Sequence, residues 1–441
     1  MTALSFRTRK HIVPRVSPMN RTYRIWYLLA VLLALAPAGV RWLWWQKTPS
    51  SVVDPAMAQA GELLFKHDWK PQDPLSPEGD GLGPVFNATS CVACHNQAGP
   101  GGAGGLDHNV TTFTVRVHGQ KPRQGVVHAH GIYYQETLHD VHPSLPAVSQ
   151  PSLDQVVRLS GQSGHCFAVP TGVNLSQRNT PALFGVKLID EIPERVILAG
   201  AKSQRLKWGL APSEDESVPV GRAHHLSNGR IGRFGWKAQM ASLSDFVQAA
   251  CANELGLGNP GQAQPKPIYS ATYYPSSGLD LTIEQCDQLT AFCASLPKPV
   301  ERLPKELTAE QASAGKKLFS TIGCADCHTP TLGSVDGIYS DLLLHQMGME
   351  LVGGGSYGEP PIPDDPDGPD DDGPSPSEWR TPPLWGVADS APYLHDGRAA
   401  TLEDAIKMHS GQGQRSARKF TSLDREEQGE LVAFLKTLRA P

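Results

Sequence analysis

The clearest pattern in the chain is an amphipathic segment that occurs twice. Residues 281–299 (LTIEQCDQLTAFCASLPKP) align without gaps with residues 423–441 (LDREEQGELVAFLKTLRAP), and the Leu, Glu, Leu, Ala, Phe, Leu and Pro positions coincide. In the first copy, apolar side chains fall on one helical face, Thr282 with Gln285 matches a capping box, and Pro297 cannot continue a helix. The pattern predicts an amphipathic helix in each copy.

Two further pairs of segments occur in the same order in both halves. Residues 61–65 (GELLF) match residues 315–319 (GKKLF), and a cysteine motif follows each of them. In residues 236–243 (WKAQMASL), Trp236 is followed seven residues later by Leu243, and in residues 395–402 (HDGRAATL), His395 is followed at the same spacing by Leu402. Three matches in one order predict that the chain consists of two homologous halves.

The two predicted halves differ in length. They divide near residues 296–304, a charged stretch with prolines that is typical of a linker. We therefore expect a first domain over residues 50–300 and a second over residues 301–441. Within the first, residues 110–117 (VTTFTVRV) and 125–134 (GVVHAHGIYY) partly alternate as strands do, which predicts an irregular, β-hairpin insertion in a mainly α framework.

The N-terminal segment is typical of an export signal. Residues 1–24 carry six Lys or Arg side chains and no Asp or Glu, and an apolar run with a Trp-rich end follows over residues 25–45. We expect this run to form an uncleaved membrane anchor, with residues 1–24 left in the cytoplasm. A cleaved signal peptide that uses the small residues at 36–38 stays open. Either way, the rest of the chain is predicted to be exported.

Composition excludes several classes of protein. The 441 residues include 39 basic and 44 acidic side chains, so the net charge of -5 lacks the basic excess of a dedicated nucleic-acid-binding protein. Eight cysteines are too few for a disulfide scaffold in a chain of this length. Their positions are more informative than their number.

Four of the cysteines form two copies of a motif for covalent haem attachment. Residues 91–95 (CVACH) and 324–328 (CADCH) both read C-x-x-C-H, the signature of c-type haem. Two thiols bond the porphyrin, and the adjacent imidazole is placed to bind its iron. A zinc site would not need the fixed histidine, and a thioredoxin-like dithiol would belong to a βαβ unit. The predicted attachment and ligand residues are Cys91, Cys94, His95, Cys324, Cys327 and His328.

The other four cysteines leave their pairing open. Cys286 and Cys293 are seven residues apart, which in a helix is about 10 Å along the axis and beyond the reach of a disulfide. A bond between Cys166 and Cys251 is one alternative. Buried free thiols are the other.

Together these residues resemble a known family of exported di-haem c-type oxidoreductases, described as peroxidases. The family is related to bacterial di-haem cytochrome c peroxidases and to the di-haem enzyme that matures methylamine dehydrogenase. The resemblance implies two cytochrome c-like haem domains related by duplication, with two covalently bound haem c groups. It covers about residues 55–441 and is carried by six segments, at residues 83–95, 179–194, 232–243, 322–332, 339–348 and 378–406.

The resemblance also implies roles for two residues between the haem motifs. The wider superfamily places a tryptophan between its haems in a Trp-x6-Leu motif, and Trp236 with Leu243 keeps that spacing. A glutamate follows on the distal side of the peroxide-reactive haem, and Glu254 matches it as the acid/base for peroxide cleavage. The distance from Trp236 to Glu254 is two residues shorter than the family pattern, and Phe246 stands where a glutamine is expected.

The distal ligands of the irons have several candidates. For the second haem, Met347 or Met349 is expected, because methionine raises the potential of a haem that accepts electrons. His345 is expected to be structural, and His395 and His409 to line a pocket or cap a helix. The histidines available to the first haem are His108, His118, His128 and His130.

The predicted function is that of a peroxidase-like enzyme in the bacterial periplasm, anchored in the inner membrane. The second haem would accept electrons from a small cytochrome c, a cupredoxin or a quinol-linked donor, Trp236 would relay them, and the first haem would reduce peroxide. The acidic run at residues 364–372 (DDPDGPDDD) is a candidate Ca²⁺ site or a solvated loop. The alternatives are an electron-transfer cytochrome without a substrate pocket and a maturation oxidase that acts on a partner protein.

Overall fold

The computed structural model describes residues 52–116, 123–159, 170, 172–209, 217–268, 278–353 and 373–441. Residues 53–441 belong to one unit. Several predictions lie outside the described residues: the basic segment and the anchor, Cys166, His118 and the acidic run at 364–372. Among the helices that are described, none has the length and apolar character needed to cross a membrane.

Helices provide most of the regular structure of the described chain, which confirms the mainly α fold class. The α-helices are α3 (Pro55–Lys66), α4 (Cys91–Cys94), α5 (Leu138–Val141), α6 (Leu153–Leu159), α7 (Val186–Asp190), α8 (Glu194–Trp208), α9 (Leu243–Leu255), α10 (Ile283–Ser295), α11 (Ala309–Thr321), α12 (Leu402–Lys407), α13 (Gln414–Ser422) and α14 (Arg425–Leu435). Short 3-10 turns lie at Leu106–His108, Cys324–Asp326, Met349–Leu351, Val387–Asp389 and Gly411–Gly413.

The strands are short and form small antiparallel sheets. They are β1 (Val85–Phe86), β2 (Val110–Val115), β3 (Arg123–Val127), β4 (His130–Gly131), β5 (Val173–Arg178), β6 (Val300–Glu301), β7 (Thr331–Leu332), β8 (Val335–Asp336), β9 (Leu344–Gln346), β10 (Glu378–Arg380) and β11 (Leu438–Arg439). The largest described sheet has the order β3-β2-β5, and the others pair β1 with β4, β9 with β10, β6 with β11 and β7 with β8.

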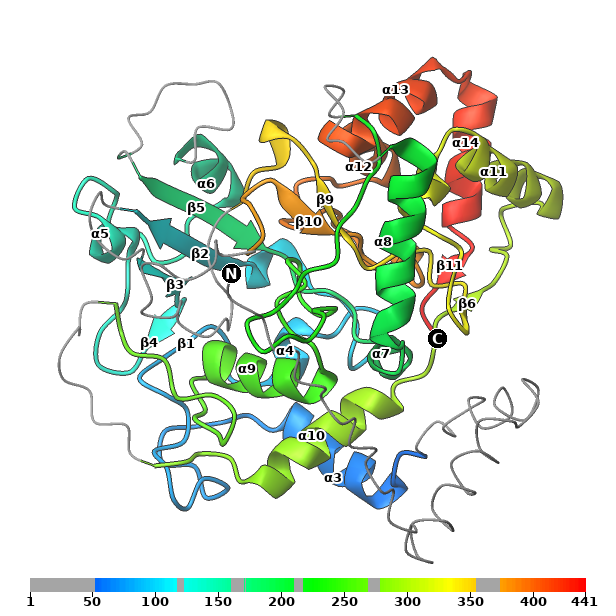
Figure 1. The fold of residues 1–441 in the computed structure, drawn as a ribbon. Helices are drawn as coiled ribbons and strands as arrows, with labels where there is room; N and C mark the ends of the chain where they lie inside the picture. Colours follow the sequence, from blue (N-terminus) through cyan, green and yellow to red (C-terminus); the bar gives the residue numbers. More distant parts are fainter. Residues whose placement is uncertain are drawn as a thin grey trace, which may run out of the picture. The chain divides into compact units, whose positions relative to one another are not determined.

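The first predicted pair of helices is present in both halves. Helix α10 begins after the capping box of Thr282 and Gln285 and ends at Ser295, close to Pro297. Helix α14 begins after a capping box of its own, formed by Asp424 and Glu427. Helix α3 packs against α10, and α11 packs against α14 (Figure 1).

The two helix pairs meet through equivalent residues. A Cβ at Gly61 in α3 would overlap the main-chain oxygen of Gln288, and a Cβ at Gly315 in α11 would overlap that of Glu430. Gln288 and Glu430 occupy the same position in the repeated segment. Each pair therefore needs a glycine where the two helices touch, and this shared geometry supports the predicted duplication.

The third sequence match also has the same local structure in both halves. Phe234 pairs with Met240 around one turn, and Tyr393 pairs with Ala399 around the other. The residue after Phe234, Gly235, has a φ of 80°, and Leu394, after Tyr393, has a φ of 71°. Ser242 then caps α9, and Thr401 caps α12. The two turns place Trp236 and His395 at equivalent positions.

The predicted β insertion is confirmed in part. Strand β2 pairs with β3, as the alternation predicted, but β3 ends at Val127 and the next residues form β4, which pairs with β1 instead. Strand β5 completes the sheet on the other side of β2 and was not predicted. Its polar residues Ser176 and Gln177 are buried, so its sequence VNLSQR lacks the hydrophobic signal of a strand.

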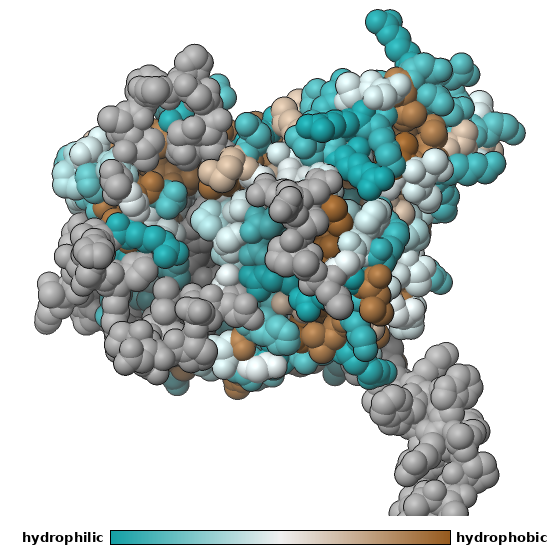
Figure 2. Space-filling view, turned by 45° about the horizontal axis from the view of Figure 1, so that its top comes forward, coloured by the Kyte–Doolittle hydropathy of each residue, from teal (hydrophilic) through white to brown (hydrophobic). Residues whose placement is uncertain are grey.

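Three hydrophobic clusters hold the described part of the chain together. The largest joins α3, α9 and α10 around the first cysteine motif and contains Phe65 and Phe292. A second joins α11 and α14 around the second motif and contains Phe319 and Phe434. A third lies under the β3-β2-β5 sheet. The face seen in Figure 2 is mainly hydrophilic, with hydrophobic residues in separate patches.

Candidate functional site

Each cysteine motif opens into its own cavity with a mainly apolar lining. Cys324, Cys327 and His328 line a cavity of about 310 Å³. Residues 91–95 contribute Cys91, Cys94 and His95 to a second cavity of about 120 Å³. An apolar cavity with two thiols and an imidazole on one wall is the environment that a covalently attached haem requires.

Both motif histidines are prepared to bind a metal through Nε2. His95 Nδ1 lies 3.1 Å from Gly102 O, and His328 Nδ1 lies 3.0 Å from Tyr339 O. Because a carbonyl oxygen can only accept, each Nδ1 must donate its hydrogen, and Nε2 carries the lone pair. Burial lowers the pKa of each imidazole to about 4, which keeps both rings neutral.

Three of the motif thiols lie where burial disfavours their ionised form. Burial raises the pKa of Cys91, Cys94 and Cys324 to about 12. Redox-active thiols have a lowered pKa. The raised pKa of these three thiols therefore distinguishes them from a redox dithiol.

Helices α3 and α11 each place a phenylalanine ring beside the motif histidine of their own half. Phe65 lies 6.2 Å from His95 between ring centroids, and Phe319 lies 6.5 Å from His328. Phe65 also packs on Phe292 of α10, and Phe319 packs on Phe434 of α14. The same aromatic contact therefore recurs at both motifs, at the matching positions of GELLF and GKKLF.

Trp236 lies at the junction of the two cavities and lines both of them. Its Nε1–H donates to Asn179 O at 2.9 Å, and the main-chain N–H of Asn179 donates to His395 O at 2.7 Å. One residue thus holds the two equivalent turns together. The placement between the motifs is the one that the resemblance predicted.

Glu254 lies in the smaller cavity, near the end of α9. Its Oε2 accepts a hydrogen bond of 2.8 Å from Asn87 Nδ2, and its main-chain oxygen accepts from Asn87 N at 2.7 Å. Asn87 Oδ1 accepts from Ala129 N at 2.9 Å, which fixes the orientation of the amide so that Nδ2 faces the carboxylate. The structure brings Glu254 and the first motif into the same cavity.

Phe246 stands between Trp236 and Glu254, at the position where the resemblance implies a glutamine. Phe246 lines both cavities and stacks on Phe234 with 6.1 Å between ring centroids. A glutamine does line the smaller cavity, but it is Gln239, in the turn that carries Trp236. Sequence spacing could not identify it, because this turn precedes α9 and has no helical period.

The two methionines expected near the second iron have different surroundings. Met347 lines the larger cavity, whereas Met349 is 77% exposed and does not. His409 lines the same cavity and is half-buried. Its ring lies 6.4 Å from that of His328 between centroids, at an interplanar angle of 64°.

His409 is in the same tautomer as the motif histidines, with Nδ1 protonated and Nε2 able to bind a metal. Its Nδ1 lies 2.7 Å from Ala405 O and must donate to it, so Nε2 carries the lone pair. Burial lowers the pKa of His409 and keeps the ring neutral. Two rings that bind one iron from opposite sides would have centroids about 6 Å apart, since metal–nitrogen bonds are about 2 Å long. His409 is therefore a second candidate, beside Met347, for a ligand of the second iron. The sequence had left open whether His409 lines a pocket or caps a helix.

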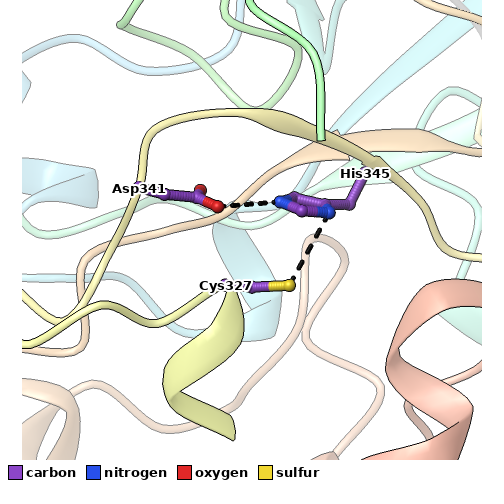
Figure 3. A group of neighbouring side chains, drawn as sticks. All are labelled: Cys327, Asp341 and His345. Atoms are coloured by element: carbon purple, nitrogen blue, oxygen red, sulfur yellow. Dashed lines mark hydrogen bonds and ion pairs between the residues drawn. The ribbon is translucent and has the colours of Figure 1, made fainter. Parts of the chain in front are cut away.

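Figure 3 shows Cys327 of the second motif beside His345 and Asp341. Cys327, Asp341 and His345 have their ligand atoms within 4.8 Å of one another. His345 Nε2 lies 2.9 Å from Asp341 Oδ2, and Nδ1 lies 2.7 Å from Gln412 Oε1 and 3.6 Å from Cys327 Sγ. Since Cys327 belongs to the haem motif, we assign the cluster to the support of that motif, in line with the expected structural role of His345.

The described histidines near the first motif have other partners. His128 is buried, with Nδ1 at 2.8 Å from Glu136 Oε2 and Nε2 at 3.1 Å from Asn253 O. His130 is exposed beside Phe86, and His108 lies 3.4 Å from Asp107 Oδ2. These contacts account for the three rings without a metal.

The remaining described cysteines carry free thiols. Cys251, Cys286 and Cys293 are buried, and the first and last of them line the smaller cavity. Burial raises the pKa of all three. The alternative of buried thiols, left open by the sequence, therefore describes Cys286 and Cys293.

Comparison with known proteins identifies a family. The family model described as "Di-haem oxidoreductase, putative peroxidase" matches residues 165–438, more than half of the chain. The matched residues include the second motif, Trp236 and Glu254, but not the first motif. The gamma subunit of hydrazine synthase from Kuenenia stuttgartiensis is 28% identical over 146 residues, which span 29% of this chain and 41% of that protein. The chain thus spans less than half the length of this relative.

Three solved structures are similar over large parts of the chain. The di-haem peroxidase BthA from Burkholderia thailandensis covers 89% of this chain and 89% of its own, at 15% identity and a TM-score of 0.39. A MauG-like protein associated with microbial copper homeostasis covers 56% and 90%, at 21% identity and a TM-score of 0.28. Hydrazine synthase of Kuenenia stuttgartiensis covers 60% and 73%, at 19% and 0.32. At these TM-scores the likenesses carry no argument of their own.

Proposed function

The chain belongs to the family of di-haem oxidoreductases, and on that premise we propose that it is an exported, c-type di-haem peroxidase. The observation that carries this proposal is the position of Trp236, which lines both cavities while each cavity contains a complete C-x-x-C-H motif. An enzyme that takes up electrons at one centre and uses them at the other needs a connection of this kind.

The residues that would hold the two cofactors are those of the motifs. Cys91 and Cys94 would attach one haem, and Cys324 and Cys327 the other. His95 and His328 would bind the irons through Nε2. When bound, the two haems supply reversible iron redox chemistry, with electrons taken up at the second and peroxide reduced at the first.

Glu254 would move the proton that peroxide cleavage requires. The oxygen nearer the iron must lose a proton and the leaving oxygen must gain one, and a carboxylate within reach of both can carry it. Asn87 Nδ2 donates to Glu254 Oε2 at 2.8 Å, which orients the carboxylate in the wall of the smaller cavity. A fixed orientation keeps the carboxylate in place between successive turnovers.

Trp236 would carry electrons or holes between the centres. Its indole hydrogen is fixed on Asn179 O, so the ring cannot rotate away from either cavity. The apolar lining around it excludes water, which lowers the reorganisation that accompanies charge transfer. Trp236 therefore has a positioning that suits repeated electron transfer.

Among the side chains of the larger cavity, His409 would suit the role of a further haem ligand better than Met347. Its ring faces His328 and has its Nε2 lone pair available. The cavity of the first motif contains Glu254 instead, which suits proton transfer to a substrate there. This difference would make one centre a relay and the other the reactive site.

The location and partners of the enzyme follow from its N-terminal segment and its chemistry. Export to the bacterial periplasm, with an anchor at residues 25–45, would place the haems where c-type attachment occurs. A small cytochrome c, a cupredoxin or a quinol-linked donor would then supply electrons. A calcium ion bound by the acidic run at residues 364–372 would have a structural role and no part in the reaction.

A maturation oxidase that withdraws electrons from a partner protein is the second candidate. Phe246 lines both cavities at the position where the superfamily has a glutamine, and Glu254 is displaced by two residues from the family spacing. These differences alter the polar surroundings of the reactive cavity. They favour a reaction in which peroxide is not turned over rapidly.

Optical and EPR spectra of the purified protein test the proposal. We expect one high-spin and one low-spin haem, with the high-spin signal changed by stoichiometric hydrogen peroxide. Steady turnover of peroxide with a small reduced donor would support the peroxidase. A spectral change without such turnover would favour the maturation oxidase. Two low-spin haems that ignore peroxide in both the oxidised and half-reduced states would overturn both and leave an electron relay.

A further inference from the structure

A buried guanidinium lies in the wall of the larger cavity, beside the turn that carries Trp236. Arg380, in strand β10, is 8% exposed and lines the larger cavity. Its Nε–H donates to Gly235 O at 2.7 Å, and Nη1 donates to Thr381 O at 3.3 Å. Its main-chain N–H donates to Trp236 O at 2.9 Å. The side chain is therefore fixed beside the turn that carries Trp236.

The charge of Arg380 is not neutralised by a carboxylate bound to it. Among the described residues, its side-chain hydrogen bonds go to the two main-chain oxygens only. Asp341 is the carboxylate that acts on it through space, but Asp341 Oδ2 already accepts from His345 at 2.9 Å and from Gln204 at 2.7 Å. Burial lowers the pKa of Arg380 to about 10, which still leaves it charged at neutral pH.

Two other arginines of this region, Arg233 and Arg222, do have carboxylate partners. Arg233 also lines the larger cavity, but its Nη2 lies 3.8 Å from Glu194 Oε1. Arg222 binds Glu378 through two hydrogen bonds of 2.6 and 2.8 Å. A buried cation without such a partner is costly unless an anion completes it. Arg380 thus indicates that the ligand of the larger cavity carries a negative charge.

We propose that Arg380 binds a propionate carboxylate of the haem in the larger cavity. This inference rests on the proposed function, which assigns a haem to that cavity. The planar fork of a guanidinium matches a carboxylate, and hydrogen bonds between two ionised groups are strong. Arg178, which is 6% exposed, lines the smaller cavity and offers the same chemistry there.

The contact has a consequence for the electron-accepting haem. A fixed positive charge near the iron favours the reduced state, because reduction lowers the positive charge of the iron by one. Arg380 would therefore raise the reduction potential of the second haem. It would also tie that haem to the Trp236 turn, since the same guanidinium binds Gly235 O.

Resonance Raman spectra and redox titration of the purified holoprotein test the proposal. In Arg380→Met we expect the propionate bending band of one haem to shift and the potential of one haem to fall, with the other haem unchanged. In Arg380→Lys we expect the band to shift while most of the potential is retained, since lysine keeps the charge but not the fork. Arg233→Lys, a change to the other guanidinium of the cavity, should leave the propionate band in place.

The possible failures are distinguishable. Wild-type protein that does not contain two haem c groups by mass and pyridine haemochrome would overturn the proposed function. Wild-type protein with two haems, together with an unchanged band and potential in Arg380→Met, would overturn the role of Arg380 alone. If Arg380→Met does not fold, the Raman band of Arg380→Lys decides, and an unshifted band would exclude the contact.

Discussion

Gly61 in helix α3 lies directly on the main chain of Gln288 in helix α10, with no room for a Cβ between them. Gly315 and Glu430 repeat the contact in the other half of the chain. In each half, the helix that carries the glycine precedes the C-x-x-C-H motif in the chain. The contact therefore sets how closely this helix approaches the repeated helix.

Alanine at either glycine should destabilise the fold. Gly61→Ala and Gly315→Ala gain up to about 1 kcal/mol of helix propensity, but they force two backbones apart, at an expected cost of roughly 1–3 kcal/mol or more. Urea denaturation of the holoprotein would measure the difference. Gly429→Ala in α14 is the matched control, because nothing lies within 4 Å of a Cβ there, and it should be neutral or stabilising. Equal stability of all three variants would contradict the packing.

The pH dependence of stability should include a contribution from Asp280. Its Oδ1 accepts from Gly81 N at 2.8 Å and its Oδ2 from Gly258 N at 2.7 Å, yet burial raises its pKa to about 6. An unfolded aspartate has a pKa of about 3.9, so between about pH 4 and pH 6 the folded state holds the proton more tightly. This contribution is complete below pH 4 and is lost as the pH rises through 6. The expected loss is roughly 1–3 kcal/mol.

Denaturation midpoints at three pH values would check this expectation. The free energy of unfolding of Asp280→Asn should vary less between pH 4 and pH 6.5 than that of the wild type, because asparagine does not ionise. Its absolute stability should fall by about 1 kcal/mol, since the amide can accept from one N–H but not from both. An identical pH dependence in the two proteins would show that the carboxyl titrates normally.

Local signals in the sequence were enough to predict the framework. Capping residues, helical apolar spacing and Pro297 located the repeated helix correctly, and the C-x-x-C-H spacing located both cavities. These features depend on neighbours a few residues away. The position of Trp236 between the cavities came from the resemblance and is present in the structure.

Features that depend on distant partners could not be predicted. Strand β5 is held by β2, more than 55 residues earlier, and its buried polar residues conceal it. Asn87 was not singled out, because its role depends on Glu254 and Ala129, which are far from it in sequence. Met347 and Met349 are two residues apart, but the 3-10 turn at Met349–Leu351 leaves Met349 exposed.

Replacement of Trp236 by phenylalanine should slow electron transfer between the haems. Phenylalanine is harder to oxidise than tryptophan and loses the hydrogen bond to Asn179 O, which contributes about 1 kcal/mol to stability. We expect peroxide turnover to fall by about tenfold or more, a barrier increase of about 1.4 kcal/mol. Trp379→Phe is the comparison, because Trp379 stacks on His395 at 3.7 Å but lines only the larger cavity. Stopped-flow measurement of the rate at which peroxide reoxidises the half-reduced protein compares the two variants. Equal rates in Trp236→Phe and Trp379→Phe would argue against a special role for Trp236.

Replacement of Glu254 by glutamine should remove proton transfer and leave the haems in place. General acid–base catalysis contributes about 10²- to 10⁴-fold, and a loss in this range is expected in the rate of the peroxide reaction. Glutamine keeps the shape and an acceptor for Asn87 Nδ2, so the spectra should be nearly unchanged. Asp107→Asn is the control, because this exposed carboxylate also acts on Cys94 but does not line the cavity. A variant Glu254→Gln that reacts with peroxide at the wild-type rate would assign the proton transfer to another group.

His409 and Met347 make opposite predictions about the second iron. Both line the larger cavity. Both also lie against Gly413, where an added Cβ would be 3.0 Å from the His409 ring and 3.2 Å from Met347 Cε. If His409 is the sixth ligand, His409→Ala should convert one low-spin EPR signal to high spin, and Met347→Ala should not. The wild-type haem should then have a lower potential than a methionine-ligated one, since methionine raises it. The reverse pattern of spin states would make Met347 the ligand, and it would assign His409, with its Nδ1 donating to Ala405 O, to the wall of the cavity.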